Sequence, residues 1–381
     1  MTTAVLTGAN SPLGARVARL LAEPVEQDSS ADPIEVIVLD ETVHPSSSAD
    51  GALSTMPDVA DVIIDLGTSD YDRRAERRES ASEFITSSLA AADRFSADQI
   101  VFVSSALVYG AAPNNPKPLT EDAVLRPDVE FVFARQLASA EELVDQWRRA
   151  RPGRSATVLR PAISLAEGDS SRLASALVYG LGRRVAQADP PSQFLHLDDL
   201  AAAIVLAVRR RLDGVFNVAP DGWVPGERVR ALSGERPRVP LPERLSEVVA
   251  SLRWRFQRGP LPPGLASYTR DPWIISNGRL REVGWEPTIT NEQAYVEATE
   301  APWWTMVSPK RRQELTLGVS VAGALLGALI LAYAGRRWWG GSPRIKRRGA
   351  PSPGSGASAT FSRRGCGVHC RRRSPGAHRR R

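Results

Sequence analysis

At 381 residues the chain is long enough for one large domain or two ordinary ones, and its 42% hydrophobic residues suffice for a sizeable core. Composition therefore excludes a chain that is disordered throughout. Charge is uneven, because residues 335–381 hold 14 Lys and Arg and no Asp or Glu. Residues 1–334 then carry a net charge of −8, so the body of the chain is not expected to bind nucleic acid.

Both cysteines, Cys366 and Cys370, lie in this basic tail, which excludes disulfides and thiol chemistry from the body. With His369 they offer three soft ligands, but nothing nearby completes a zinc site, so we prefer a chance cluster and expect no metal. The N-terminus enters an apolar run without a basic region or a cleavage site. It predicts no secretory signal peptide and a cytoplasmic body.

Short apolar runs alternate with helical patterns as far as residue 220. Strands are expected at residues 4–7, 34–39, 59–66, 99–104, 156–159 and 214–218. Helices are expected at residues 15–22, 82–94, 133–149 and 200–210. The last of these helices is expected to be capped by Asp198 and Asp199. Apolar strands separated by helices predict a Rossmann-type, doubly wound parallel sheet in an α/β domain over residues 1–220.

The texture of the sequence changes after residue 220, where Pro and Arg become frequent. Helices are expected at residues 227–232 and 243–256, within a small C-terminal substrate lobe at 221–300 that is intertwined with the first domain. Arginines at 253, 255 and 258 could bind a charged substrate, but a solvated helix face is the preferred interpretation.

An uncharged run follows the lobe at residues 315–334. As a helix its 20 residues would cross a bilayer core of roughly 30 Å. Basic residues and Trp pairs flank it at both ends, as is typical of membrane interfaces. We expect one transmembrane helix after a juxtamembrane linker at 301–314, and a single-pass protein of the cell membrane with its globular domain in the cytoplasm. A buried Ala/Gly-rich core helix is the alternative.

Residues 335–381 are rich in Arg, Gly, Ser and Pro and are expected to be disordered. Their charge favours anionic membrane lipid as a partner. Within the apolar run, Gly323 and Gly327 form a GxxxG pair, a pattern that can support helix pairing but is common by chance in such segments. A homodimer is therefore left open.

The first strand leads into a glycine-rich turn, Gly8-Ala-Asn-Ser-Pro-Leu-Gly14. Gly8 permits a tight turn, Gly14 permits close packing of helix on strand, and the helix N-terminus then presents N–H groups to a pyrophosphate. Asp40 closes the next strand, where a carboxylate would accept the ribose hydroxyls and repel a 2′-phosphate. NAD is thus favoured over NADP. The candidate cofactor-binding residues of this part are Gly8, Asn10, Ser11, Pro12, Leu13, Gly14 and Asp40.

Six segments in order resemble the extended short-chain dehydrogenase/reductases, in the NAD-dependent epimerase/dehydratase group that acts on nucleotide sugars. They are TGANSPLG at 7–14, VSSALVYG at 103–110, LRPA at 159–162, FLHLDDLA at 194–201, GVFNV at 214–218 and LREVGWEP at 280–287. Actinobacterial epimerase-like proteins are the most similar in style. The resemblance implies that Ser104 and Pro161 contact the cofactor and that Ser105 is a helper hydroxyl in catalysis.

The chain departs from that family where the family carries its YxxxK pair. Phe133 occupies the place of the Tyr and Leu137 that of the Lys. Loss of a general acid/base costs about 10²–10⁴ in rate, and Ser105 alone has no pKa near neutrality. Tyr109 is a candidate replacement, although the resemblance implies a structural role for it. Ser11 stands where the family has the middle glycine of its turn, and its side chain is expected to narrow the approach of the pyrophosphate.

Three functions remain open: an enzyme acting on a nucleotide sugar or lipid-linked sugar at the membrane, a non-catalytic NAD-binding sensor or scaffold, and an enzyme of this fold with another cofactor or substrate. Among the other motif residues, His196 is expected to be a packed histidine. Arg160 could steady either a phosphate or a loop.

Overall fold

The computed structural model describes residues 2–23, 34–39, 59–66, 81–182, 189–233 and 264–299. Within these ranges lies a six-stranded sheet in the order β2-β1-β3-β4-β5-β8, with every neighbouring pair parallel. Its strands are β1 (Thr3–Thr7), β2 (Glu35–Leu39), β3 (Val62–Asp65), β4 (Gln99–Val103), β5 (Ser155–Pro161) and β8 (Gly214–Val218). Each overlaps a strand expected from the apolar runs, which confirms the predicted parallel sheet.

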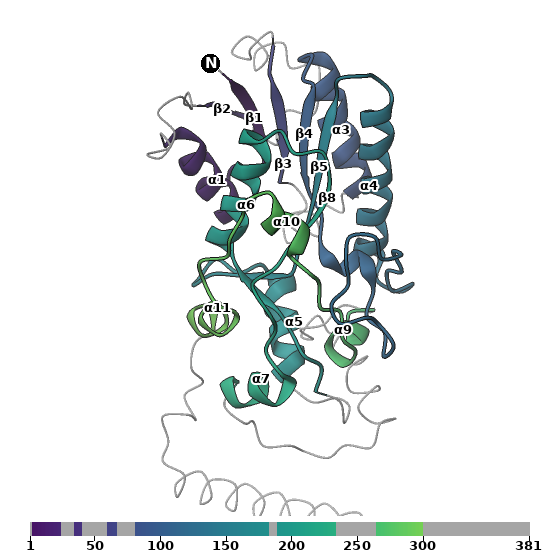
Figure 1. The fold of residues 1–381 in the computed structure, drawn as a ribbon, viewed down its shortest axis with the longest axis vertical. Helices are drawn as coiled ribbons and strands as arrows, with labels where there is room; N and C mark the ends of the chain where they lie inside the picture. Colours follow the sequence, from purple (N-terminus) through teal and green to yellow (C-terminus); the bar gives the residue numbers. More distant parts are fainter. Residues whose placement is uncertain are drawn as a thin grey trace, which may run out of the picture. The chain divides into compact units, whose positions relative to one another are not determined.

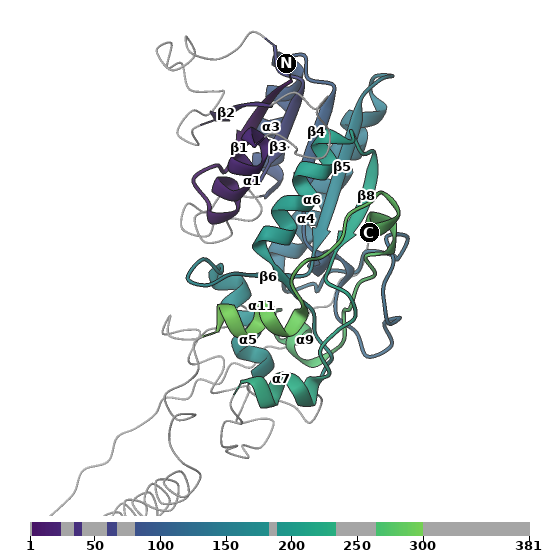
Figure 2. The ribbon, with the colours of Figure 1, turned by 60° about the vertical axis from the view of Figure 1, so that its left-hand side comes forward.

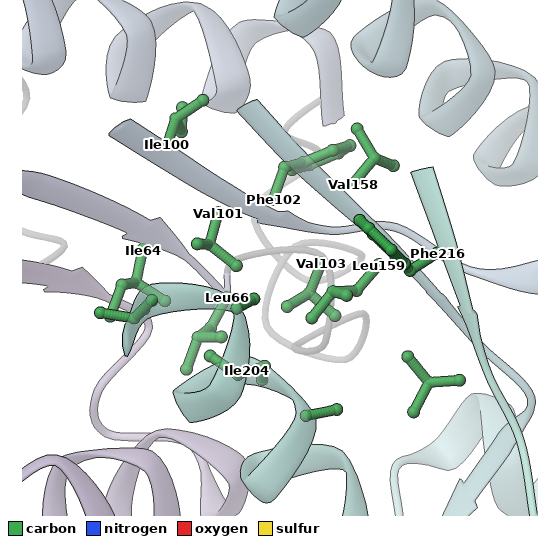
Figure 3. Packing of buried hydrophobic residues seen from close by; sticks show 14 of the residues in the cluster. Ile64, Leu66, Ile100, Val101, Phe102, Val103, Val158, Leu159, Ile204 and Phe216 are labelled. Atoms are coloured by element: carbon green, nitrogen blue, oxygen red, sulfur yellow. The ribbon is translucent and has the colours of Figure 1, made fainter. Parts of the chain in front are cut away.

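Helices cover both faces of this sheet (Figure 1). On one face α1 (Pro12–Ala22) packs beside α6 (Leu197–Arg209), and on the other α3 (Ala81–Arg94) packs beside α4 (Val132–Arg149). Figure 3 shows the cause in β4: Val101 and Val103 point towards Ile204 of α6, whereas Ile100 and Phe102 point to the opposite face. A strand that buries both faces has no polar alternation, which is why its sequence is continuously apolar.

A second, smaller core lies at one end of the sheet (Figure 2). Its elements are β6 (Ile163–Leu165), β7 (Phe194–His196), α5 (Arg172–Gly182), α7 (Gly226–Leu232), α9 (Ala266–Arg270) and α11 (Asn291–Ala298). β6 and β7 pair in parallel. This smaller core also includes Leu107, Phe131 and Ala134, so it is intertwined with the chain of the larger sheet. Conversely, Leu280 of α10 (Gly278–Glu282) packs into the core of the large sheet.

The helix α11 is fastened to β7 and to α6. The ring centroids of Phe194 and Tyr295 are 4.8 Å apart, and the Phe194 N–H donates to Asn291 Oδ1 at 3.0 Å. The buried carboxylate of Asp199, in α6, accepts from the N–H groups of Thr288 and Ile289, each at 3.0 Å. These two residues directly precede the N-cap of α11. One carboxylate therefore holds the segment that leads into the last described helix.

The cap of α6 differs from the expectation. His196, not the pair Asp198 and Asp199, is the N-cap, and its Nδ1 accepts from the Asp198 N–H at 3.1 Å. Both aspartates lie in the first turn, where negative charge favours the helix dipole. The expectation was wrong because Leu197 is helical, which starts α6 three residues earlier than its apolar periodicity suggests. His196 is buried, as expected of a packed histidine.

Several expectations concern residues outside the described ranges. They are Asp40, the helix at 243–256 with its three arginines, the linker at 301–314, the apolar run at 315–334, and the basic tail with its cysteines. Among the helices of the described ranges, none combines the length and apolar character that crossing a bilayer requires. No group of three or more His, Cys, Asp or Glu in those ranges is placed to hold a metal ion.

Candidate functional site

The glycine-rich turn between β1 and α1 has the geometry expected of it. Gly8 has a φ of +72°, a conformation in which a side chain is strained. A Cβ added to Gly14 would lie 2.5 Å from the Gly8 carbonyl oxygen and 2.6 Å from Ala9 Cα, inside contact distance. Gly14 is therefore required for the close approach of α1 to the turn.

Ser11 is the N-cap of α1, and its side chain points back into the turn. Its hydroxyl donates to the Gly8 carbonyl at 2.7 Å, and its Oγ accepts from the Gly14 N–H at 3.0 Å. The residue is only 5% exposed. Ser11 does not simply project into the path of a ligand, as the sequence suggested; it occupies a backbone donor of the helix N-terminus.

A pocket opens at the carboxyl ends of β1, β4 and β5. It encloses about 770 Å³, its open mouth included. Strands are added to the sheet in opposite directions from β1, because β2 lies on one side of it and β3 on the other. Open parallel sheets bind ligands at such a switch point. The pocket is lined by Ser11, Pro12, Leu13, Val103, Ser104, Ser105, Leu107, Phe133, Pro161, Ala162, Ile163, Ser164, Asp169, Ser171, Leu173, Ala174, Leu177, Leu197, Leu200 and Trp273.

Two adjacent serines after β4 reach the pocket with different hydrogen bonds. The Ser104 hydroxyl donates to Glu141 Oε1, a buried carboxylate oxygen, so its proton is already used in a hydrogen bond inside the protein. Ser105 caps the 3₁₀ turn at Ala106–Tyr109 by accepting from the Leu107 N–H at 3.3 Å. In the part of the chain that the structure describes, the Ser105 hydroxyl proton has no acceptor. Ser105 is thus able to donate to a bound ligand.

Tyr109 is not brought to the pocket. It is 2% exposed, and its hydroxyl donates to Asn217 Oδ1 at 2.7 Å and accepts from Arg160 Nη1 at 2.7 Å. Burial raises the pKa of its phenol, even though Arg160 acts in the opposite direction. The 3₁₀ turn that begins after Ser105 carries the ring into the core. Tyr109 is therefore not placed to act as an acid/base in this pocket.

Arg160 steadies the interior and not a phosphate. It forms a buried ion pair with Glu141 of α4, with Nη2 and Oε2 2.6 Å apart. Its Cζ also lies 4.8 Å from the centre of the Tyr109 ring. The side chains of Ser104, Glu141, Arg160 and Tyr109 therefore form one continuous buried network behind the pocket wall.

The positions of the missing pair lie on the face of α4 that turns towards the sheet. Phe133, Leu137 and Glu141 are spaced four residues apart, which places them on one side of the helix. Phe133 is half-buried and lines the pocket, whereas Leu137 is fully buried in the core. Where the resemblance implies a hydroxyl and an amine, this chain has a pocket-lining ring and a core side chain.

An aromatic cluster backs Phe133. Its ring lies 6.0 Å from that of Phe131, which lies 5.8 Å from Tyr268. The rings of Tyr268 and Trp273 are packed edge to face with their centroids 5.7 Å apart, and Trp273 also lines the pocket. The Tyr268 hydroxyl donates to the Leu107 carbonyl at 2.7 Å, and burial raises the pKa of Tyr268 to about 12. This side of the pocket is thus a rigid apolar wall.

The remaining cofactor candidates are distributed around the same edge. Pro161 lines the pocket at the end of β5. Asn10 is exposed at the tip of the turn and is not among the lining residues. Asp40 itself lies outside the described residues, but Leu39 before it pairs with Thr7, in the strand that leads into the turn.

Sequence reasoning missed three residues of the site, and only one of them carried a usable signal. Asp169 lines the pocket and pairs with Arg16 of α1 at 3.0 Å, and Arg16 also pairs with Asp198 at 2.7 Å. Trp273 arrives from a Pro- and Arg-rich stretch without periodicity. The spacing of Glu141 from Phe133 and Leu137 was a usable signal for its inward position.

Comparison with known proteins agrees with this geometry. The model of the NAD dependent epimerase/dehydratase family matches residues 4–219. The uncharacterized protein Rv0501 of Mycobacterium tuberculosis is 27% identical over 198 residues, 52% of each chain. The chain thus spans about half the length of the curated relatives it matches.

Two solved structures share the fold. The UDP-glucose 4-epimerase of Thermus thermophilus in complex with NAD has 16% identity and a TM-score of 0.52, covering 78% of this chain and 97% of its own. A tyrosine-to-phenylalanine mutant of the UDP-glucuronic acid 4-epimerase of Bacillus cereus, in complex with NAD and UDP-4-deoxy-4-fluoro-glucuronic acid, has 13% identity and a TM-score of 0.54. It covers 78% of this chain and 98% of its own.

Proposed function

Because the chain belongs to the NAD dependent epimerase/dehydratase family, we propose that it binds NAD and acts on a nucleotide sugar or a related sugar at the cell membrane, with a reduced acid/base apparatus. One observation carries the proposal: a single pocket joins the glycine-rich turn, the Ser105 hydroxyl and the smaller lobe. This arrangement supports a dinucleotide at the α1 end and a second ligand beside Ser105 and the smaller lobe.

The residues at the α1 end fit a dinucleotide. Leu13 lies in the first turn of α1, where a helix leaves its N–H groups without partners inside the helix, and it lines the pocket, so its N–H would donate to the pyrophosphate. Asp40, directly after β2, would accept the adenosine ribose hydroxyls and disfavour NADP. When bound, NAD accepts or donates a hydride at its nicotinamide ring. Ser105 would donate to the substrate oxygen, while Phe133 and Trp273 would exclude water beside it.

The reduced apparatus follows from Phe133 and Leu137, since neither can exchange a proton. The tyrosine-to-phenylalanine mutant of the Bacillus cereus epimerase holds both NAD and a nucleotide-sugar analogue. Loss of a tyrosine hydroxyl in this fold is thus compatible with binding, and Ser105 would carry what catalysis remains.

A second function is favoured by the full burial of Leu137. A core leucine cannot be exchanged for lysine without loss of packing, so this position belongs to the scaffold. The alternative is a catalytically inactive NAD-binding sensor or scaffold, tethered to the membrane and acting through a partner.

Cofactor binding is the first test. Titration of the full-length chain with NADH should quench its tryptophan emission by energy transfer to the bound NADH, because Trp273 lines the pocket. NADPH should bind more weakly than NADH. An absence of binding at millimolar NADH would refute the cofactor assignment.

Turnover separates the two functions. Ser105→Ala should abolish any residual epimerisation of UDP-glucose or UDP-galactose by the wild type, while leaving NADH affinity nearly unchanged. Phe133→Tyr, alone and with Leu137→Lys, should raise turnover if the site has only lost its acid/base. If wild type and variants all bind NADH and none shows turnover, the sensor or scaffold function is the better account.

The proposed membrane tether is argued from the sequence alone, since residues 315–334 lie outside the described ranges. The full chain should stay with the membrane fraction after alkaline extraction, and a chain ending at Pro309 should not. NADH binding by the shorter chain would be the control for folding. Equal release of both chains would contradict the tether.

A further inference from the structure

We propose that the second ligand of this pocket is a sugar joined to an alkyl chain, and not a nucleoside diphosphate sugar. The inference rests on the proposed function and narrows its substrate. It comes from a continuous set of apolar side chains on the lobe side of the pocket, which we call the lobe wall. The lobe wall consists of Leu107, Phe133, Ile163, Leu173, Leu177 and Trp273.

The lobe wall is one surface, because its residues belong to one hydrophobic cluster. Phe133 and Trp273 pack against the smaller core, and the other four are buried members of it. They come from separate segments of the chain, namely the 3₁₀ turn after β4, α4, β6, α5 and the segment between α9 and α10. An alkyl group laid on this surface leaves water much as a core side chain does, which is favourable.

The space beside the lobe wall is narrow. Leu107 and Leu177 line the pocket although each is only 2% exposed. Leu173 stands four residues before Leu177, so the two share one face of α5. Trp273 is held in position, because its Nε1–H donates to the Tyr268 carbonyl at 2.9 Å. A slender alkyl chain suits such a slot between fixed side chains better than a bulky, polar nucleoside does.

The charges around the pocket point to the same ligand. Among the lining residues in the described part of the chain, Asp169 alone is charged, and its carboxylate lies 3.0 Å from Arg16. Arg160 lies behind the pocket, but it is paired with the buried Glu141. Proteins hold a diphosphate with Arg, Lys or backbone donors. The N-terminus of α1 supplies such donors for the dinucleotide, whereas the side chains of the lobe wall supply none for a second diphosphate.

Hydroxyl groups beside the lobe wall suit the sugar. The Ser105 hydroxyl has a proton to donate, since its Oγ accepts from the Leu107 N–H and no acceptor for the proton lies in the described ranges. Ser164 also lines the pocket, and its hydroxyl donates to the Ala162 carbonyl at 3.1 Å, which leaves its oxygen able to accept from a sugar hydroxyl. The sugar would therefore lie by these two serines, with its alkyl chain along the lobe wall.

The test is a calorimetric titration of the full-length chain, held in lipid nanodiscs and saturated with NADH, with methyl, butyl and hexyl β-glucoside. Empty nanodiscs give the blank for partition of each glucoside into lipid. Each added CH₂ group should tighten binding by up to about fourfold, which is the change expected when that group is buried. UDP-glucose should bind more weakly than hexyl β-glucoside.

Two leucines of α5 give a matched pair of variants. Leu177 lines the pocket, whereas Leu181, four residues later, packs against the same core and does not line the pocket. Leu177→Ala should weaken hexyl β-glucoside binding at least about fivefold and leave methyl β-glucoside binding nearly unchanged. Leu181→Ala should change neither Kd. NADH binding by both variants is the control for folding, and if either fails to fold, the glucoside series on the wild type decides alone.

Equal Kd values for methyl and hexyl β-glucoside in the wild type would overturn the inference, because the alkyl chain would then have no contact with the lobe wall. Equal losses in the two variants would also overturn it, by tracing the effect to the core and not to the pocket. Tighter binding of UDP-glucose than of hexyl β-glucoside would overturn it while the proposed function stands. If the chain binds NADH but no sugar, the substrate of the proposed function is wrong as well, and without NADH binding the whole proposed function fails.

Discussion

The two ends of the pocket differ in what holds their chemistry. At the α1 end, the features that suit a dinucleotide belong to the backbone: the φ of Gly8, the contact at Gly14 and the N–H of Leu13. At the α4 end, the resemblance implies a hydroxyl and an amine on side chains, and this chain has Phe133 and Leu137 at those positions. Backbone features are enforced by packing, whereas a functional side chain is easily exchanged for an apolar one. A substitution at the α4 end can therefore change the chemistry of the pocket without altering the turn at the α1 end.

The largest effect should come from the ion pair behind the α4 end. Glu141→Gln leaves Arg160 buried without its counter-charge, and breaking a buried pair in this way costs about 3–5 kcal/mol. Urea unfolding of the variant should show this loss. The neighbouring Glu142 is exposed, and Glu142→Gln should change the unfolding free energy by less than about 0.5 kcal/mol. Equal effects would mean that this face of α4 is not held by the pair.

A second substitution tests the α1 end. Gly14→Ala places a Cβ 2.5 Å from the Gly8 carbonyl oxygen, which should cost about 1–3 kcal/mol and weaken NADH binding at least about tenfold. Gly153→Ala is the control: its φ is +92° but no atom lies within 4 Å of the added Cβ. The control should lose about 1 kcal/mol by backbone strain and keep its Kd. Normal binding by Gly14→Ala would show that the turn is adaptable.

The smallest effect concerns pH and the aromatic wall. The pKa of Tyr268 is raised to about 12 by burial, against about 10 in an unfolded chain. Between these values the folded protein keeps a proton that the unfolded chain releases. The unfolding free energy should therefore fall as pH rises from about 10 to 12, by at most about 1.4 kcal/mol per pH unit from this group.

The check on this slope is Tyr268→Phe, which should be less stable at neutral pH, because the hydrogen bond to the Leu107 carbonyl is lost. Its unfolding free energy should nevertheless depend less steeply on pH above 10. A slope identical to that of the wild type would place the titration elsewhere.

The parallel sheet was predictable because a strand buried on both faces leaves a continuous apolar run. β6 and β7 were missed because three residues are too few to show a period. α5 was missed although its sequence is apolar, since no strand pattern frames it. The start of α6 was misjudged because a histidine cap is not a usual N-terminal signal.

The site was predictable where it lies close to a strand end. Ser11, Ser104, Ser105 and Pro161 all line the pocket, and the ordered motifs located them. The orientation of Tyr109 was not predictable, because it depends on a single 3₁₀ turn after Ser105. Asp169 and Trp273 come from segments that only the tertiary structure places beside the pocket.

The hydrogen bonds of Asp199 have a mechanical consequence. The chain leaves α11 at Thr299, so a force applied to the chain beyond that residue would act first on α11. Such a load passes first to the contact between Phe194 and Tyr295, and then to the bonds that Asp199 accepts from Thr288 and Ile289. Because Asp199 belongs to the first turn of α6, and Leu197 and Leu200 of that helix line the pocket, a force applied to the C-terminal segment is delivered next to the binding site.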